Sequence, residues 1–100
     1  MRYDDFRKRL VDALLNAPGD TPDTQRRAVL EQGSMPPALA GYVDTVKRHA
    51  YKVTDADIAA LQRAGHSDDS LFEITVLASV GAALHRLDRG MAALRGEEPD

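Results

Sequence analysis

Three neighbouring side chains near the C-terminus, His85, Arg86 and Arg89, form the combination best suited to chemistry in this chain. An imidazole titrates near neutral pH, so His85 is a candidate general base. Guanidinium groups bind carboxylates and phosphates through paired hydrogen bonds, which suits Arg86 or Arg89 to an anionic substrate. On a helix Asp88 lies within reach of His85 and could orient and charge it. The alternative is a hydrogen-bonded histidine in the core or in a subunit interface.

Three further side chains, Tyr42, His49 and Glu73, are candidates to line a ligand pocket. His49 is expected at the end of a helix, where the dipole favours a protonated imidazole, so a capping role competes with a ligand role. Tyr42 and Tyr51 could face a pocket, although their helical spacing also fits the core. Glu73 lies near the start of the same helix as His85 and could face a neighbouring helix.

Metal and cofactor chemistry have no recognisable motif in this sequence. Asp55, Asp57, Asp68 and Asp69 cluster at expected helix starts, where they complement the helix dipole. His66 lies in a predicted turn and is expected to be solvated. The spacing of these acids and histidines fits no metal site, and no phosphate-loop, dinucleotide-binding or nucleophile-elbow motif is present. We expect no metal and no cofactor.

The composition is that of one small soluble domain. One hundred residues can bury a single core, and with three Tyr, two Phe and no Trp this core must consist mainly of Ala, Leu and Val. We find no apolar run approaching the ~20 residues of a membrane span. The N-terminus is charged and lacks the apolar region of a signal peptide. We therefore expect a cytoplasmic protein with no membrane contact.

The net charge of −3 is unevenly distributed along the chain. Residues 1–52 carry nine basic and seven acidic residues, for +2, whereas residues 53–100 carry four and nine, for −5. The short basic groups, including Lys47-Arg48, have acids nearby, so we interpret them as solvated helix faces rather than a nucleic-acid surface. The asymmetry does fit weak electrostatic docking to a protein partner.

Hydrophobic periodicity predicts helices and no strands. Five helices are expected, at about residues 4–15, 22–31, 37–51, 54–64 and 71–95. Pro18 ends the first, and Thr21 is placed to cap the second with Pro22 in its first turn. We divide the single domain into an N-terminal helix and linker, helices two and three, a helical core and a tail, at residues 1–20, 21–52, 53–96 and 97–100.

The fourth and fifth helices have the clearest signals. Thr54-x-x-Asp57 resembles a capping box, Gly65 is expected in the left-handed conformation that ends a helix, and Ser67 offers the next cap. The apolar residues of the last helix then step by three and four, at Leu77, Val80, Leu84, Leu87, Met91 and Leu94. A neighbouring row contains Ile74, Ala78, Gly81, His85 and Ala92. Two rows must both be buried, so we expect this helix to be central or shared between subunits.

The second half of the chain resembles the alkylhydroperoxidase D-like, or carboxymuconolactone decarboxylase-like, superfamily. The matching residues are Val53, Thr54, Asp57, Ile58, Leu61, Ala64, Gly65, Ser67, Asp68 and Leu71, with His85-Arg86 where members often show Asn-Arg. The resemblance implies an all-α and usually oligomeric protein. The redox branch works through a Cys-x-x-Cys pair followed by a His, and this chain has no cysteine. No catalytic residue is carried over from the superfamily.

We therefore predict an all-α homo-oligomer of about five helices packed around one long C-terminal helix. The favoured role is a non-redox structural, interaction or small-ligand-binding module, in which Glu or Arg at Gly81 or Leu84 breaks assembly. One alternative is a decarboxylase- or isomerase-type enzyme that uses His85 with Arg86 or Arg89 in a closed pocket. Another is an accessory subunit of a separately encoded partner. We expect no thiol-dependent peroxidase activity from this chain alone.

Overall fold

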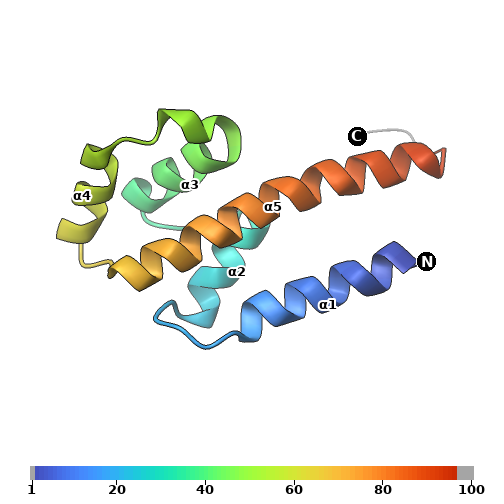
Figure 1. Cartoon of the computed structure of the whole chain (residues 1–100), viewed down its shortest axis with the longest axis horizontal. Coiled ribbons are helices and arrows are strands. Elements are labelled where there is room, and N and C mark those ends of the chain that lie inside the picture. Colours follow the sequence, from blue (N-terminus) through green and yellow to red (C-terminus); the bar gives the residue numbers. More distant parts are fainter. Residues whose placement is uncertain (1, 97–100) are drawn as a thin grey trace.

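A computed structural model describes residues 2–96, and this part of the chain is all-helical. Its elements are α1 (Arg2–Asn16), α2 (Asp23–Glu31), α3 (Pro37–His49), the short 3-10 helix η1 (Ala50–Lys52), α4 (Asp55–Arg63) and α5 (Asp68–Leu94). Figure 1 shows α5 running the length of the molecule, with α3 and α4 on one side and α1 and α2 on the other. The predicted all-α class with a long C-terminal helix is confirmed; the predicted tail at 97–100 lies outside the described residues.

The core forms where α2, α3 and α4 meet the first half of α5. Its largest fully buried side chains are Leu39, Ile74 and Val29. Both apolar rows of α5 enter this core, since Ala78 of one row and Leu77 and Leu84 of the other are buried. The row that starts at Leu77 then leaves the core, because its later members Leu87 and Leu94 are 46% and 79% exposed. The central position predicted for this helix therefore holds for its first half.

Gly81 and Leu84 lie inside the chain rather than on a free face. A Cβ at Gly81 would sit 3.0 Å from the Leu30 carbonyl oxygen, so the missing side chain allows the backbone of α2 to approach α5. Leu84 is buried in the core. A charged substitution at either position would disrupt this intrachain packing, so its effect would not be specific to assembly.

Local signals define the starts of α4 and α5. The Thr54 hydroxyl accepts from the Asp57 amide at 3.2 Å and the Asp57 carboxylate accepts from the Thr54 amide at 2.9 Å, which is the predicted capping box. Gly65 follows α4 with a φ of +103°, as predicted for a helix end. Ser67 caps α5 by accepting from the Ser70 amide at 3.0 Å. This cap makes α5 begin at Asp68, three residues before the predicted start.

The predicted cap of α2 was wrong. Pro22 occupies the N-cap position, no side chain caps the helix, and Thr21 lies outside it. The Thr21 hydroxyl instead lies 2.9 Å from the Ser70 hydroxyl in a buried contact with α5. The Thr21 hydroxyl bonds to Ser70 rather than to the start of α2, because a buried hydroxyl without a hydrogen bond costs more free energy than an exposed helix end without a cap.

Among the described residues one helix, α5, is long and apolar enough to cross a membrane by length and composition, with a mean hydropathy of 1.2 over its best 18-residue window. The core helix of a globular protein meets the same measure, and a third of that window (33%) is buried inside the chain. The expectations of no membrane contact and of a cytoplasmic location stay predictions.

Candidate functional site

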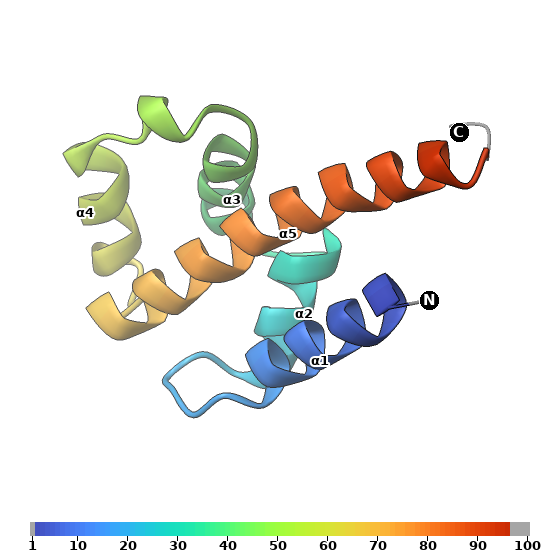
Figure 2. The ribbon, with the colours of Figure 1, turned by 45° about the vertical axis from the view of Figure 1, so that its right-hand side comes forward.

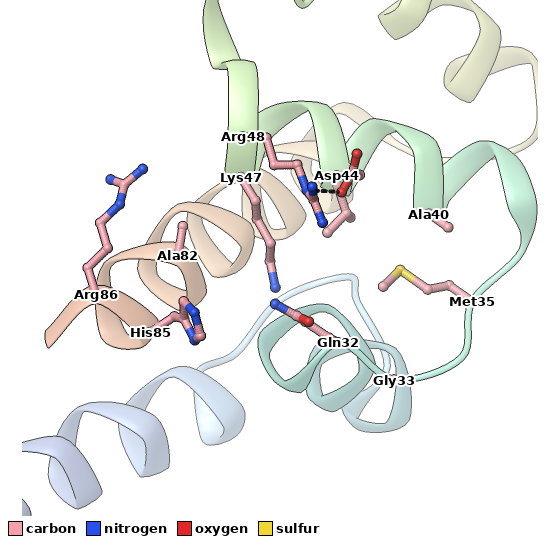
Figure 3. A pocket seen from close by; sticks show the side chains of 11 residues that line it. Gln32, Gly33, Met35, Ala40, Asp44, Lys47, Arg48, Ala82, His85 and Arg86 are labelled. Atoms are coloured by element: carbon pink, nitrogen blue, oxygen red, sulfur yellow. Dashed lines mark ion pairs between the residues drawn. The ribbon is translucent and has the colours of Figure 1, made fainter. Parts of the chain in front are cut away.

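A pocket of about 450 Å³ lies between the end of α2, the α3 helix and the middle of α5 (Figure 3). We call it the α2–α3–α5 pocket. Met35, Ala40, Val43 and Ala82 form its apolar wall, and Gln32, Asp44, Lys47, Arg48, His85 and Arg86 contribute its polar groups, with Gly33 at one edge. Its volume and mixed lining are those of a small-molecule site.

The pocket exists because α2 ends abruptly at Gln32. This residue adopts a left-handed conformation with a φ of +59°, and its amide bonds back to the Ala28 carbonyl. The Gly33 amide bonds to the same carbonyl at 2.7 Å. The helix therefore ends at this point, and Gly33 and Met35, from the segment between α2 and α3, line the pocket.

Lys47 is the unusual side chain of this pocket, and the sequence analysis missed it. Its Nζ atom is buried and has no hydrogen-bond partner in the part of the chain that the structure describes. Burial lowers the pKa of Lys47, with the nearby Asp44 carboxylate acting in the opposite direction. The prediction that Lys47 and Arg48 share a solvated helix face is correct for Arg48 and wrong for Lys47.

The surroundings explain why Lys47 points inward. It follows Val43 by four residues and therefore shares the buried face of α3. The position that a Cβ at Gly81 would occupy lies 3.3 Å from Nζ, so the glycine leaves room for the amine on α5. Figure 3 shows the Lys47 amine and the Gln32 amide pointing toward one another across the pocket. Arg48 instead turns outward and pairs with Asp44 at 2.8 Å.

Two of the three predicted catalytic residues, His85 and Arg86, line this pocket, and Arg89 does not. His85 faces the same space as Lys47, whereas the Arg86 side chain extends away from the other labelled groups (Figure 3). His85 is exposed, so it is not a buried core histidine. The pocket is open to solvent at its rim and is not the closed site expected of an enzyme.

Asp88 does not orient His85. Its carboxylate accepts from the Tyr3 hydroxyl at 2.6 Å and from Arg7 at 2.9 Å and 3.0 Å. These contacts join α1 to the second half of α5, alongside which α1 runs in both Figure 1 and Figure 2. The Arg7 hydrogen bonds lower the pKa of Asp88, with smaller contributions from Tyr3 and from the charge of His85. Asp88 thus has a structural role.

Glu73 likewise anchors the fold, away from the α2–α3–α5 pocket. Its carboxylate accepts from the Thr21 amide at 2.9 Å and from the Asp20 amide at 3.1 Å. Arg26, which is buried, lies 3.6 Å from the same carboxylate and donates to the carbonyl oxygens of Thr21, Leu14 and Ala17. Hydrogen bonding from Thr21, aided by the Asp20 amide and Arg26, lowers the pKa of Glu73.

The remaining candidates, Tyr42 and His49, also lie outside the α2–α3–α5 pocket. Tyr42 is buried, and its hydroxyl is 2.6 Å from the Thr75 hydroxyl, which fits the core role. His49 ends α3, as predicted, and its exposed ring meets Tyr51 edge-on with 5.9 Å between centroids. The structure therefore brings His85 together with Lys47. Arg86 lines the same pocket with its side chain directed away from both, and Tyr42, His49 and Glu73 lie elsewhere.

The pocket has an excess of positive charge. Arg48 and Asp44 neutralise each other, which leaves Lys47, Arg86 and His85 as the remaining basic side chains of the pocket.

Within residues 2–96 no group of three or more His, Asp or Glu side chains is arranged to hold a metal ion. No protein-family profile, curated protein sequence or solved structure matches this chain.

Proposed function

We propose that this protein is a non-redox binding module that holds a small organic anion in the α2–α3–α5 pocket. One observation carries the proposal: the Lys47 amine is buried without a hydrogen-bond partner among the described residues. A buried amine is costly in its charged form unless an opposite charge or an acceptor meets it. A bound carboxylate would supply both.

The other groups of the pocket favour the same class of ligand. His85 and Arg86 add positive character from α5, and the acid on α3 is already paired with Arg48. The wall formed by Met35, Val43 and Ala82 suits a short hydrocarbon body. These features together support a small carboxylate with an apolar portion, rather than an inorganic ion alone.

The proposal is tested by amide NMR spectra of the wild-type chain during titration with lactate. We expect saturable shifts at Gly33, Ala82 and His85, which surround the pocket. Lys47→Met should abolish these shifts. The matched control is Lys52→Met, because Lys52 is an exposed lysine in η1 and should leave binding unchanged. Equal shifts in all three proteins would refute the site.

Homo-oligomer formation remains our proposal for the surface of α5. Leu87 and Leu94 continue the three- and four-residue spacing of the row that includes the buried Leu77 and Leu84, yet they are exposed. Phe6 on α1 and Phe72 on α5 are also large exposed apolar side chains, at 48% and 70%. Burying such groups against a second copy would remove them from water. Light scattering should show an oligomer that Leu94→Glu weakens, and a wild-type monomer would contradict this proposal.

The resemblance to the alkylhydroperoxidase D-like superfamily is likewise a proposal. It is supported by the capping box of α4, the left-handed Gly65 and the long helix that follows them.

The alternative function is an enzyme with His85 as general base. It is supported by the presence of both His85 and Arg86 in the lining of the pocket. Turnover of a 2-oxo or 3-oxo acid that His85→Gln abolishes, with lactate binding retained, would favour the enzyme over the binding module.

A further inference from the structure

We propose that the Nζ of Lys47 captures a 2-oxo acid as a covalent imine. This inference rests on the anion-binding function proposed above, since the 2-oxo acid would occupy the same α2–α3–α5 pocket. Its carbonyl carbon, rather than its carboxylate, would lie against the Lys47 amine, so that the amine stays neutral. An amine can attack a carbonyl carbon only when it is neutral, because an ammonium ion has no free electron pair. The pocket supplies the conditions for a neutral amine at Lys47.

Lys47 differs from the other lysines of this chain in both burial and partners. The chain contains three lysines. Lys8 has a side chain that is 78% exposed and pairs with Asp12 at 3.0 Å. Lys52 is exposed and lies 5.9 Å from the centre of the Tyr51 ring. Desolvation of the buried Lys47 amine favours its neutral form.

Among the charged groups around Lys47, the Asp44 carboxylate acts against burial and raises the pKa of the amine. On α3 the one acid, Asp44, is bonded to Arg48 at 2.8 Å, which weakens its attraction for the Lys47 proton. On α5 the nearby ionisable groups are His85 and Arg86, and the end of α2 presents the neutral Gln32 amide. Cations near an amine disfavour its protonation, and they also attract the carboxylate of a substrate.

Gly81 on α5 leaves room for the Lys47 amine itself. A Cβ at this position would lie 3.3 Å from Nζ and 3.0 Å from the Leu30 carbonyl oxygen, so any side chain here would crowd the amine. Lys47 and His85 both line the α2–α3–α5 pocket and face the same space (Figure 3). The 2-oxo acid can therefore place its carboxylate toward His85 while its carbonyl carbon approaches Nζ.

The reaction needs no oxidant or reductant. The neutral Nζ forms a bond to the carbonyl carbon as the carbon–oxygen π bond breaks, and one proton passes from the nitrogen to the carbonyl oxygen, which gives a neutral carbinolamine. The carbon–oxygen bond then breaks, and the oxygen leaves as water after accepting a proton from His85. The products are the protonated imine and one water molecule. His85 is placed for this step because it lines the pocket and faces the same space as Lys47, and an imidazole group is a common general acid (Figure 3).

The experiment is reductive trapping of the full chain with pyruvate and sodium cyanoborohydride, which converts an imine into a stable secondary amine. Mass spectrometry with peptide mapping should place a carboxyethyl group on Lys47, with Lys8 and Lys52 unmodified after the same exposure. The peptide that contains position 47 should lose the adduct in Lys47→Met and keep it in Lys52→Met. Equal modification of the three lysines in the wild-type chain would overturn the proposal.

Lactate separates failure of the imine from failure of the anion site, because it carries a carboxylate but no carbonyl carbon that can form an imine. If lactate binds and pyruvate leaves no adduct, the imine proposal fails and the anion site stands. If neither binds, both fail. Lys47→Arg keeps a cation and cannot form an imine, so it should bind lactate without trapping pyruvate. The peptide map of the wild-type chain decides the question even if a variant fails to fold.

Discussion

Replacing Lys47 with methionine is expected to stabilise the protein while abolishing its binding function. A buried donor without a partner costs about 1–3 kcal/mol, and a charged one costs more. Methionine has nearly the shape of the lysine stem and leaves no cavity. The attraction of Asp44 and the ability of the amine to lose its proton both limit the cost in the wild type. We therefore expect the free energy of unfolding to rise by about 1–2 kcal/mol.

The assay is urea and thermal unfolding of wild type, Lys47→Met and Lys52→Met, followed by circular dichroism. In a domain of this size a gain of ~1 kcal/mol raises Tm by about 4–8 °C. Lys52 is exposed, so its substitution should change the free energy of unfolding by less than about 0.5 kcal/mol. A Lys47→Met protein less stable than wild type would refute the reasoning, because the amine would then contribute to the folded state.

The pH dependence of the stability difference between wild type and Lys47→Met tests whether desolvation of the Lys47 amine causes it. In the unfolded chain Lys47 has its ordinary pKa of 10.5, and burial lowers this value in the folded chain. Between the two values the unfolded state binds more protons, so wild-type stability rises with pH in this interval. The advantage of Lys47→Met is therefore largest below the folded-state pKa and disappears as the pH approaches 10.5. A difference that is constant with pH would contradict a desolvated amine.

Further predictions concern the two structural carboxylates. Glu73→Gln leaves the buried Arg26 without its counter-charge, and chemical unfolding should show a loss of about 2–3 kcal/mol, against less than about 0.5 for the exposed control Glu31→Gln. Asp88→Asn loosens the first turns of α1, which hydrogen exchange should detect, at a cost of at most about 1 kcal/mol because this pair is partly exposed. Both carboxyl pKa values are lowered in the folded chain, so their contribution is present above the ordinary carboxyl pKa and is lost as the pH falls through the folded values. Each variant should therefore show a weaker loss of stability in acid than wild type.

The parts of the fold that follow from local interactions could be predicted from the sequence. The capping box at Thr54 and Asp57 and the left-handed Gly65 involve residues close together in the chain. The Thr21 hydroxyl could not be placed in this way, because its partner Ser70 is 49 residues away. Asp88 shows the same limit, since its partners Arg7 and Tyr3 come from the other end of the chain.

The candidate site was only partly predictable for a related reason. His85 and Arg86 were selected by residue type, and the structure places both in the α2–α3–α5 pocket. Residue type alone does not identify Lys47, because Lys47 and the exposed Arg48 are adjacent and together resemble a basic surface group. The helical spacing does predict the direction of Lys47, because it follows the buried Val43 by four residues and therefore faces inward. A charged residue on the apolar face of a helix therefore indicates a candidate site.

The most direct measurement of the central claim is the pKa of Lys47, obtained by NMR from the chemical shift of its ε-carbon with and without lactate. Lys8 and Lys52 are internal references in the same spectra. We expect a pKa below 10.5 in the free protein, which moves back toward that value when lactate saturates the pocket. A pKa at or above 10.5 that lactate does not change would contradict a buried amine that recruits an anion.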